Sequence, residues 1–242
     1  MNIKVVGLGG IGGCLLPSLM RFLNFSLEDV MVTLVDGDSF EDRNLERQVF
    51  HRRGSKVEVW LENLISDFKR IEFQTHNVYV TEANIISIIR EKDIVFLCVD
   101  NHVTRKLVSS RAEDLSDVVI ISGGNDFTDG SVQVFIRKDG KNITLPLASE
   151  YHPEIDYPED EDPLIHEGCY EVQNRMPQLI ITNNFVAALM LNVFYGYINK
   201  KIDYDEIYLD VLTNSVRSVC RSKDIRANLN VEPLAKETKG KE

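Results

Sequence analysis

Cysteine is scarce in this sequence, and its few cysteines are widely separated. Cys14, Cys98, Cys169 and Cys220 form no C-x-x-C pair, so a four-cysteine zinc site with that spacing is excluded. We therefore expect no zinc. Scattered thiols of this kind are typical of proteins from a reducing compartment, where cysteines stay unpaired.

Positive charge is also in short supply. The chain has 38 acidic and 27 basic side chains, for a formal net charge of −11, whereas a general nucleic-acid-binding protein needs a basic face. A basic and apolar signal segment is missing as well, because the sequence starts almost directly in an apolar strand. We therefore expect a cytoplasmic protein that binds no nucleic acid.

Internal repeats are absent, and the length of 242 residues fits one domain with a core large enough to fold alone. Apolar strands alternate with amphipathic helices, which predicts an α/β, Rossmann-like fold with a mostly parallel sheet and helices on both faces. We assign residues 1–230 to this domain, with a long acidic loop near 140–175. Residues 231–242 are expected to form a polar, disordered tail.

The C-terminal half predicts an antiparallel extension of the sheet. Ser131–Arg137 alternates apolar and polar residues, which predicts a strand with one more exposed face. A turn follows at Asp139 and Gly140. Tyr204–Val219 predicts two further strands that pair about a turn.

Only one apolar run is long enough to raise the question of a membrane span. It covers Gln178–Asn199 and is interrupted by Asn183, Asn184 and Asn192. A buried core helix or a dimer helix is therefore the favoured interpretation. The surplus of apolar surface on this helix predicts a homodimer, and we expect no membrane partner.

A glycine-rich turn near the N-terminus is the most informative motif that is present. Gly7, Gly9 and Gly12 follow an apolar strand and precede a helix pattern, with the G-x-G-x-x-G spacing of a nucleotide-binding turn that also includes Gly10 and Ile11. Glycine lets the backbone turn sharply and approach phosphates, and the helix N-terminus adds free N–H groups. The alternative interpretation is a glycine-rich turn without a ligand.

Polar residues follow the second predicted strand, Val30–Val35. Asp36 ends this strand, about where an acidic residue of such a fold contacts the ribose hydroxyls. The following segment carries further polar and charged candidates: Asp38, Asn44, Arg47, Gln48 and Lys56. Its two cations suit a triphosphate under attack better than a nicotinamide, which disfavours a dehydrogenase. The alternative for these cations, as for Asp38, is ordinary surface charge.

A later apolar strand, Ile94–Val99, ends in Asp100 and Asn101. A carboxylate at the carboxyl end of a parallel strand lies on the ligand side of the sheet. Mg²⁺ is usually held by one or two carboxylates together with substrate phosphates, so Asp100 is a candidate Mg²⁺ ligand. The alternative is that Asp100 caps the helix that follows, and the two roles are compatible.

The ordered set G-x-G-G-x-G, D-x-D, N-x-x-R-Q, a lysine and D-N resembles the ThiF/MoeB/HesA family, the bacterial relatives of ubiquitin-activating enzymes. The similarity runs from about Ile3 to about Asn199. The resemblance implies an ATP-dependent adenylyltransferase. Its substrate would be the C-terminal carboxylate of a ubiquitin-like or sulfur-carrier protein ending in Gly-Gly, or of a short peptide.

The resemblance also implies roles for the matched residues. It assigns ribose binding to Asp36, phosphate contacts to Asn44, Arg47 and Lys56, and Mg²⁺ at the site of attack to Asp100. Gln48 and Arg105 match as well. Gln48 has a purely structural role as its alternative, and Arg105 is a candidate for holding the neighbouring loop. Asp38 and Asn101 complete the candidate nucleotide site.

Cys169 precedes the apolar helix, in a predicted loop. In the family that the sequence resembles, a cysteine at this place can take part in thioester or acyl-persulfide chemistry. A loop thiol becomes nucleophilic when its pKa falls, but Glu167 and Glu171 oppose thiolate formation. Cys169 is therefore a candidate catalytic residue, with an inert cysteine as the alternative.

The sequence departs from the family pattern in two respects. It lacks the zinc-binding cysteines, and it begins without an extra N-terminal helix whose arginine reaches across a dimer to the partner's ATP. Arg43, Arg52 and Arg53 are the candidate replacements. These departures keep a second hypothesis open, a non-catalytic relative that binds nucleotide or a partner as a scaffold. A nicotinamide-dependent oxidoreductase is the third hypothesis, and the motif at 44–48 makes it the weakest.

Overall fold

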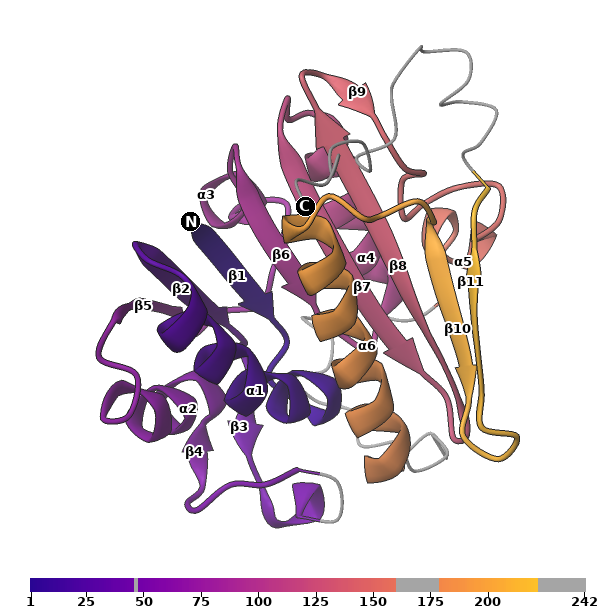
Figure 1. Cartoon of the computed structure of the whole chain (residues 1–242). Coiled ribbons are helices and arrows are strands. Elements are labelled where there is room, and N and C mark those ends of the chain that lie inside the picture. Colours follow the sequence, from indigo (N-terminus) through magenta and orange to yellow (C-terminus); the bar gives the residue numbers. More distant parts are fainter. Residues whose placement is uncertain (46–47, 160–178, 222–242) are drawn as a thin grey trace, which may run out of the picture.

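A mixed sheet forms the centre of the protein in this computed structural model, which describes residues 1–45, 48–159 and 179–221 (Figure 1). The strands of this sheet are β1 (Asn2–Val6), β2 (Val30–Val35), β5 (Ile71–His76), β6 (Asp93–Leu97), β7 (Val118–Asn125), β8 (Asp129–Lys138), β9 (Lys141–Asn142), β10 (Glu206–Asp210) and β11 (Ser215–Val219). Within the described ranges their order is β11-β10-β8-β7-β6-β1-β2-β5, and β9 pairs with β8. A separate small sheet joins β3 (Ser39–Phe40) to β4 (Gly54–Ser55).

The main sheet has a parallel half and an antiparallel half. β1 pairs in parallel with β2 and β6, β2 with β5, and β6 with β7. From β7 onward the neighbours β8, β10 and β11 pair in antiparallel fashion. The predicted Rossmann-like sheet with an antiparallel C-terminal extension is therefore confirmed.

The strand order reverses at β1. The chain passes from β1 to β2 and β5 on one side, and then crosses to β6 on the other side of β1. In an open α/β sheet, ligands bind beyond the carboxyl ends of the strands at such a reversal. Residues 7–9 after β1 and residues 98–101 after β6 lie at this point.

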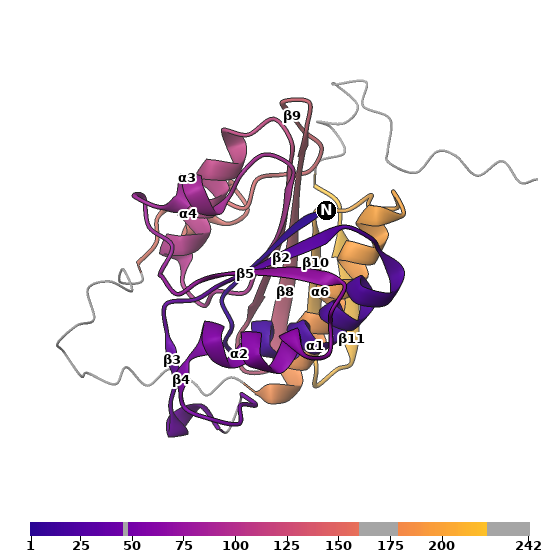
Figure 2. The same cartoon turned by 90° about the vertical axis from the view of Figure 1, so that its left-hand side faces the viewer.

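Helices cover both faces of the sheet (Figure 2). They are α1 (Gly10–Ser26), α2 (Lys56–Ile65), α3 (Ile85–Ile88), α4 (His102–Glu113), α5 (Pro153–Asp156) and α6 (Ile180–Ile198). Two buried clusters result, because alternate strand residues face opposite sides. Ile3 and Val5 of β1 join the cluster beneath α1, α2 and α6, whereas Val6 joins the one beneath α3, α4 and α5.

α6 confirms the predicted apolar helix. It packs against α1 and lies across β7 and β8, with Val186, Met190 and Val193 in the core. Among the described residues, it is the one helix long and apolar enough to cross a membrane, by length and composition alone. Its other face exposes apolar side chains, of which Ile181 is 60% exposed and Tyr195 58% exposed.

The predicted exposure of the strand at 131–137 is wrong. Val132 and Val134 of β8 lie in the core beneath α6, and Phe135 is buried in the core on the opposite face. The segment that follows β9 covers this second face, where Leu147 and Ile155 pack into the same cluster as Phe135. Alternation along a strand cannot reveal such a cover, because the covering residues come from elsewhere in the chain.

Candidate functional site

The glycine-rich turn joins β1 to α1 at the reversal point of the sheet. Gly7 has a φ of +89°, in the left-handed region that glycine adopts without strain, and its N–H donates to the Val35 carbonyl oxygen at 2.9 Å. A Cβ on Gly12 would lie 2.0 Å from the carbonyl oxygen of Gly7. The spacing of these two glycines is therefore required by direct contact between the strand end and the first turn of α1.

The N-terminus of α1 carries no side-chain cap. Its N-cap residue is Gly9, which has no side chain to accept a hydrogen bond, and its first turn contains no acidic residue. The first N–H groups of such a helix lack intrahelical partners and carry a partial positive charge, which together favour an anion such as phosphate.

Asp36 supports this turn from the end of β2. Its Oδ2 accepts a hydrogen bond from the Leu8 N–H at 2.6 Å, and its Oδ1 accepts one from the Asp38 N–H at 2.7 Å. Asp36 is 9% exposed, and burial raises the pKa of its carboxyl group, although nearby Lys56 opposes the change. The candidate ribose ligand thus lies against the glycine-rich turn.

Lys56 reaches the same carboxylates from the start of α2. The pairing of β3 with β4 brings the two segments together, and the Lys56 N–H donates to the Asp38 carbonyl oxygen at 3.0 Å. The Lys56 Nζ lies 2.7 Å from Asp38 Oδ2 and 3.9 Å from Asp36 Oδ2. Tyr79, beyond β5, completes the cluster because its hydroxyl donates to Asp38 Oδ1 at 2.5 Å.

A polar cavity of about 350 Å³ opens beside this cluster. Its lining residues are Gly37, Asp38, Ser39, Glu41, Asn44, Lys56 and Tyr79. Asn44 is oriented by a short 3₁₀ turn, in which its Oδ1 accepts a hydrogen bond from the Glu41 N–H at 2.9 Å. The structure therefore brings three predicted residues together here, and it adds Tyr79, which the sequence did not indicate.

The side chain of Gln48 packs against the glycine-rich turn. A Cβ built on Gly9 would be 3.6 Å from Gln48 Nε2. Gln48 is 9% exposed, and its Oε1 has no hydrogen-bond partner. The predicted nucleotide-side position of Gln48 is thus compatible with its location, while Arg47 lies outside the described residues and its predicted role stays a prediction.

Asp100 and Asn101 follow β6, the strand next to β1. Asn101 is the N-cap of α4, with its Oδ1 accepting a hydrogen bond from the Thr104 N–H at 2.8 Å. The alternative role of Asp100 as a helix cap is therefore wrong, because Asn101 caps α4. Asp100 is exposed at the ligand side of the sheet, where a single carboxylate fits Mg²⁺ shared with substrate phosphates. The described residues contain no group of three or more His, Cys, Asp or Glu suited to a metal ion.

Arg105 is buried, and its hydrogen bonds hold the segment that precedes Asp100 in place. Its guanidinium donates to the carbonyl oxygens of Val99 and Gly123, each at 2.8 Å, and to the Ser122 hydroxyl at 2.9 Å. These bonds tie the end of β6 to β7. Arg105 is therefore placed to fix the loop that carries Asp100, and a direct contact with nucleotide stays a prediction.

The remaining candidates are the cysteines and the arginines considered as replacements for the missing N-terminal arginine. Cys169 lies outside the described residues, so its proposed chemistry stays a prediction. Cys98 is buried, and burial raises the pKa of its thiol to about 12, which fits a packing role. Arg52 is paired with Glu62, and Arg53 with Asp42.

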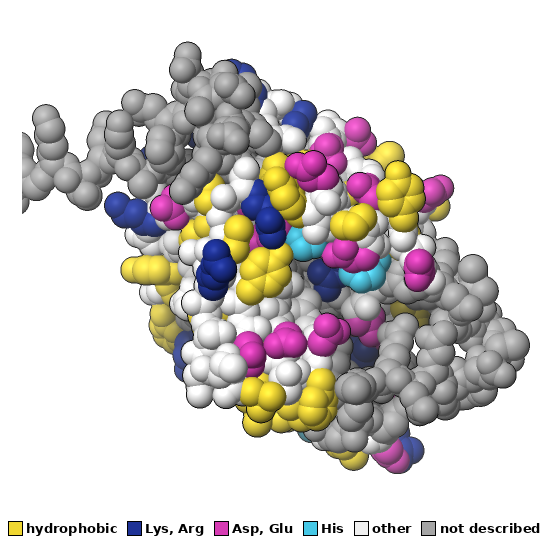
Figure 3. All heavy atoms as spheres, turned by 90° about the vertical axis from the view of Figure 1, so that its right-hand side faces the viewer, with side chains coloured by type: hydrophobic (Ala, Val, Ile, Leu, Met, Phe, Trp, Pro, Cys, Tyr) yellow, Lys and Arg dark blue, Asp and Glu magenta, His cyan; other side chains and the backbone are white. Residues whose placement is uncertain are grey.

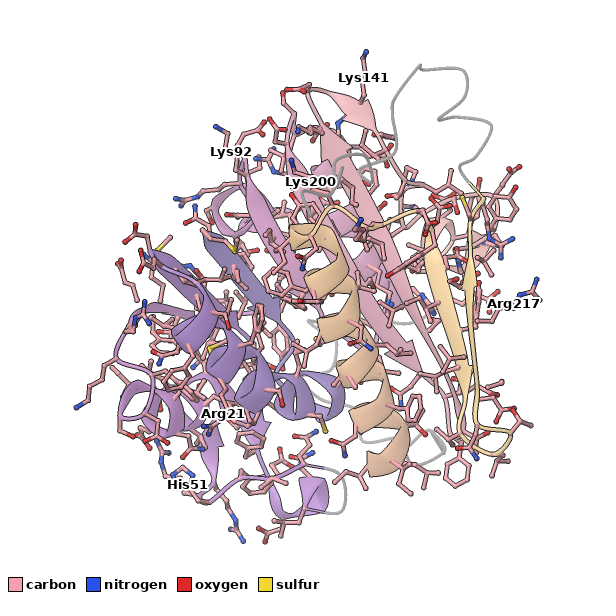
Figure 4. The ribbon with its side chains drawn as sticks, viewed as in Figure 1. Arg21, His51, Lys92, Lys141, Lys200 and Arg217 are labelled. Atoms are coloured by element: carbon pink, nitrogen blue, oxygen red, sulfur yellow. The ribbon has the colours of Figure 1, made fainter. Side chains whose placement is uncertain are left out.

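Several cations lie far from this edge of the sheet. Figure 4 shows the labelled side chains of Lys92, Lys141 and Lys200 at the opposite end, near the amino ends of the parallel strands. Lys56 is therefore the lysine that the described structure supplies to the cavity beside the turn.

One family model covers all of the residues that the structure describes. The model, described as the ThiF family, matches residues 1–221. The chain belongs to the ThiF family. The resemblance inferred from the ordered motifs is therefore confirmed.

Curated relatives share this region at low identity. The chain is 25% identical over 226 residues to "Adenylyltransferase and sulfurtransferase UBA4" of Candida glabrata, covering 92% of this chain and 48% of that protein. It is 27% identical over 200 residues to the protein of the same name from Ogataea parapolymorpha, covering 81% and 48%. The chain thus spans about half the length, or less, of the curated relatives that it matches.

Solved structures of similar fold include E. coli MccB with ATP and PaaA. MccB with ATP aligns with a TM-score of 0.65 at 16% identity, over 90% of this chain and 62% of that chain. PaaA aligns with a TM-score of 0.64 at 15% identity, over the same shares. Similarity at this level of identity shows a shared fold.

Proposed function

We propose that this site catalyses the ATP-dependent adenylation of a C-terminal carboxylate. The observation that carries the proposal is the meeting, at one sheet edge, of an uncapped helix N-terminus, the Asp36–Lys56 cluster and the exposed Asp100. Membership of the ThiF family and the adenylyltransferase names of the curated relatives support it.

The residues at this edge fit ATP. The N–H groups at the start of α1 suit phosphate oxygens. Asp36 already accepts two backbone N–H bonds, and its oxygens keep lone pairs for ribose hydroxyls. Lys56 has three N–H donors, so it can turn from Asp38 to a phosphate oxygen. Asp100 would hold Mg²⁺, which supplies positive charge to the phosphates when bound.

The reaction is a displacement at the α-phosphorus. An oxygen of the carboxylate forms a bond to this phosphorus, the bond to the bridging oxygen breaks, and its electron pair leaves with pyrophosphate. Both reactants are anions, so the protein must neutralise charge and align them, and the step needs no covalent nucleophile. Lys56 and the α1 N-terminus would supply these two effects.

The substrate that we propose is a ubiquitin-like or sulfur-carrier protein ending in Gly-Gly, or a short peptide. The relatives named UBA4 are described as sulfurtransferases as well as adenylyltransferases, and solved structures of E. coli MccB include one with MccA. A later transfer of the acyl group to the Cys169 thiolate, with AMP leaving, is the second step that we propose for the full chain.

ATP–pyrophosphate exchange tests the proposal. We expect candidate carriers or peptides ending in Gly-Gly to support exchange, and Asp100→Ala to lower its rate by about 10²–10³-fold. Lys141→Ala, at the opposite end of the sheet, is the matched control and should leave the rate unchanged. Exchange that is indifferent to Asp100→Ala would remove the assigned mechanism. Tight ATP binding without exchange for every carrier would instead favour the non-catalytic scaffold.

We also propose a homodimer that uses the exposed face of α6. Ile181 and Tyr195 lie on this face, and Phe25 of α1 is 68% exposed. Burying this apolar surface against a second copy would remove it from water. Sedimentation at micromolar concentration should show a dimer, and Ile181→Asp should shift it towards monomer. A wild-type chain that sediments only as a monomer would contradict the proposal.

A further inference from the structure

Asn183 of α6 is a fully buried amide without hydrogen bonds. It is 0% exposed, and neither its Nδ2 nor its Oδ1 has a partner. In the part of the chain that the structure describes, it is the one residue for which two such side-chain atoms are recorded. An unpaired buried polar group typically costs about 1–3 kcal/mol, so the position of this amide requires an explanation.

The amide of Asn183 lies directly against the glycine-rich turn. A Cβ built on Gly10 would be 2.4 Å from Asn183 Nδ2 and 3.1 Å from its Oδ1. Gly10 is the first residue of α1, and α6 runs beside α1 (Figure 1). The missing side chain at Gly10 is therefore what allows an amide to occupy this place at the helix N-terminus.

A second amide, with an unpaired oxygen, flanks the same turn. Gln48 approaches Gly9 with its Nε2, and its Oε1 has no partner, so two amides from distant segments lie over consecutive glycines. Asn24 shows that a buried asparagine elsewhere in the fold is satisfied. It is 5% exposed on α1, and its Oδ1 accepts a hydrogen bond from the Arg70 N–H at 3.1 Å.

We propose that Asn183 is a substrate-positioning residue of the adenylation site. Its Nδ2 donates a hydrogen bond to an oxygen of the α-phosphate, and its Oδ1 accepts one from the backbone N–H of the incoming C-terminal residue. An amide suits this place because it holds a donor and an acceptor without net charge. A carboxylate would repel phosphate, and a lysine would offer nothing to a peptide N–H. The inference rests on the proposed function.

The Asn183 side chain is fully buried in the structure, so the side chains around it must move before a ligand can reach it. The unpaired atoms would then gain their partners only in the complex. This arrangement makes a prediction that an ordinary core residue does not share. Removing the amide should stabilise the free protein, because the free protein bears the cost of burying its unpaired atoms. It should weaken the complex, because the hydrogen bonds of the amide form only there.

The test compares Asn183→Leu, which keeps the approximate size, with Asn24→Leu. We measure urea unfolding of the free protein, direct ATP binding by calorimetry, and ATP–pyrophosphate exchange. Asn183→Leu should raise the unfolding midpoint, weaken ATP binding about tenfold and raise the KM for the carrier. Asn24→Leu should lower the midpoint, because a made hydrogen bond is lost, and leave ATP affinity unchanged. Asn183→Ser, which keeps a donor and an acceptor, should recover part of the ATP affinity.

Two outcomes would overturn the inference. The first is wild-type ATP affinity and wild-type KM in Asn183→Leu. The second is a fall in unfolding midpoint, for both Asn183→Leu and Asn183→Ser, with ATP affinity unchanged in the folded fraction, as expected of a purely structural amide. Failure of the proposed function has a different signature, a wild-type protein that binds ATP but exchanges pyrophosphate with no carrier. In that case, the ATP affinities of the wild type and of Asn183→Leu, measured by calorimetry, still test whether Asn183 contacts the phosphate.

Discussion

Two buried carboxylates, Asp36 beside the glycine-rich turn and Glu206 at the start of β10, occupy contrasting surroundings. Asp36 is 9% exposed and Glu206 is 3% exposed. Burial raises the pKa of Asp36, and the opposing effect of Lys56 does not cancel it. Burial acts on Glu206 in the same direction, but hydrogen bonds from His152 and Tyr208 outweigh it and lower its pKa to about 2.

The contacts explain this difference. Glu206 Oε1 is 2.5 Å from His152 Nε2, while its Oε2 accepts hydrogen bonds from the Tyr208 hydroxyl at 2.6 Å and from Arg221 Nε at 3.1 Å. Acidic, basic and histidine side chains gather on this side of the molecule (Figure 3). Asp36 has two backbone N–H donors, and its nearest cation, the Lys56 Nζ, is 3.9 Å away and closer to Asp38.

The comparison separates a region whose buried charges are paired within the chain from the region that we propose binds a ligand. The donors around Glu206 offset the cost of its burial within the folded chain. At the turn, the cost of burying the Asp36 carboxylate and the unpaired Oε1 of Gln48 is not fully offset. Binding sites commonly sacrifice stability in this way, because their polar groups are arranged for a partner. Four predictions test the contrast.

The largest effect is expected from Lys56→Met. The substitution removes a cation that we assign to the phosphates, so ATP–pyrophosphate exchange should fall by about 10²–10³-fold. The pKa of Asp36 should rise further, because Lys56 is the main group that lowers it. Kinetics of exchange and the pH dependence of ATP binding measure the two effects. Exchange within about twofold of wild type would contradict the role of Lys56.

Glu206→Gln should destabilise the remote cluster without affecting ATP binding. A pKa that moves from 4.5 to about 2 corresponds to about 3 kcal/mol, an upper estimate for the loss. For Glu206 this stability is present above pH 4.5 and is lost as the pH falls towards 2. Urea unfolding of both proteins across this range measures it. A free-energy difference that grows towards low pH would contradict the assignment.

His152 should add the opposite pH dependence to the same cluster. Burial works against its protonated ring, but hydrogen bonds with Glu206 and Glu154 outweigh it and raise its pKa above 6.5. Its contribution is therefore complete below pH 6.5 and is lost as the pH rises through the folded-state pKa. His152→Gln should remove this alkaline loss in urea unfolding experiments. The same alkaline loss in the variant would show that another group causes it.

The smallest effect is expected from Tyr79→Phe. The change removes one hydrogen bond to Asp38, worth about 1 kcal/mol, while the ring keeps its place against Gly37. The KM for ATP should rise by a few-fold, with kcat almost unchanged, in steady-state exchange assays. A loss of about a hundredfold in kcat would place Tyr79 in the chemical step and would alter the account of this wall of the cavity.

The sequence predicted the glycine-rich turn because the spacing of Gly7 and Gly12 reflects a backbone contact that leaves no room for a Cβ on Gly12. The nearness of Asp38, Asn44 and Lys56 to the nucleotide-facing edge also followed, since all three come shortly after the second strand. Other features depend on tertiary placement. Tyr79 reaches the cavity only because it packs on Gly37. In the sequence, Asn183 only interrupts an apolar helix, and its place beside the glycine-rich turn depends on the packing of α6 against α1.

The fate of the carboxylate oxygen tests the central claim most directly. A peptide ending in Gly-Gly, with a heavy oxygen isotope in its terminal carboxylate, is incubated with the protein, ATP, Mg²⁺ and hydroxylamine to trap the activated acyl group. Attack at the α-phosphorus predicts that one heavy oxygen appears in AMP. Heavy oxygen in inorganic phosphate would instead show attack at the γ-phosphorus and would contradict adenylation at this site.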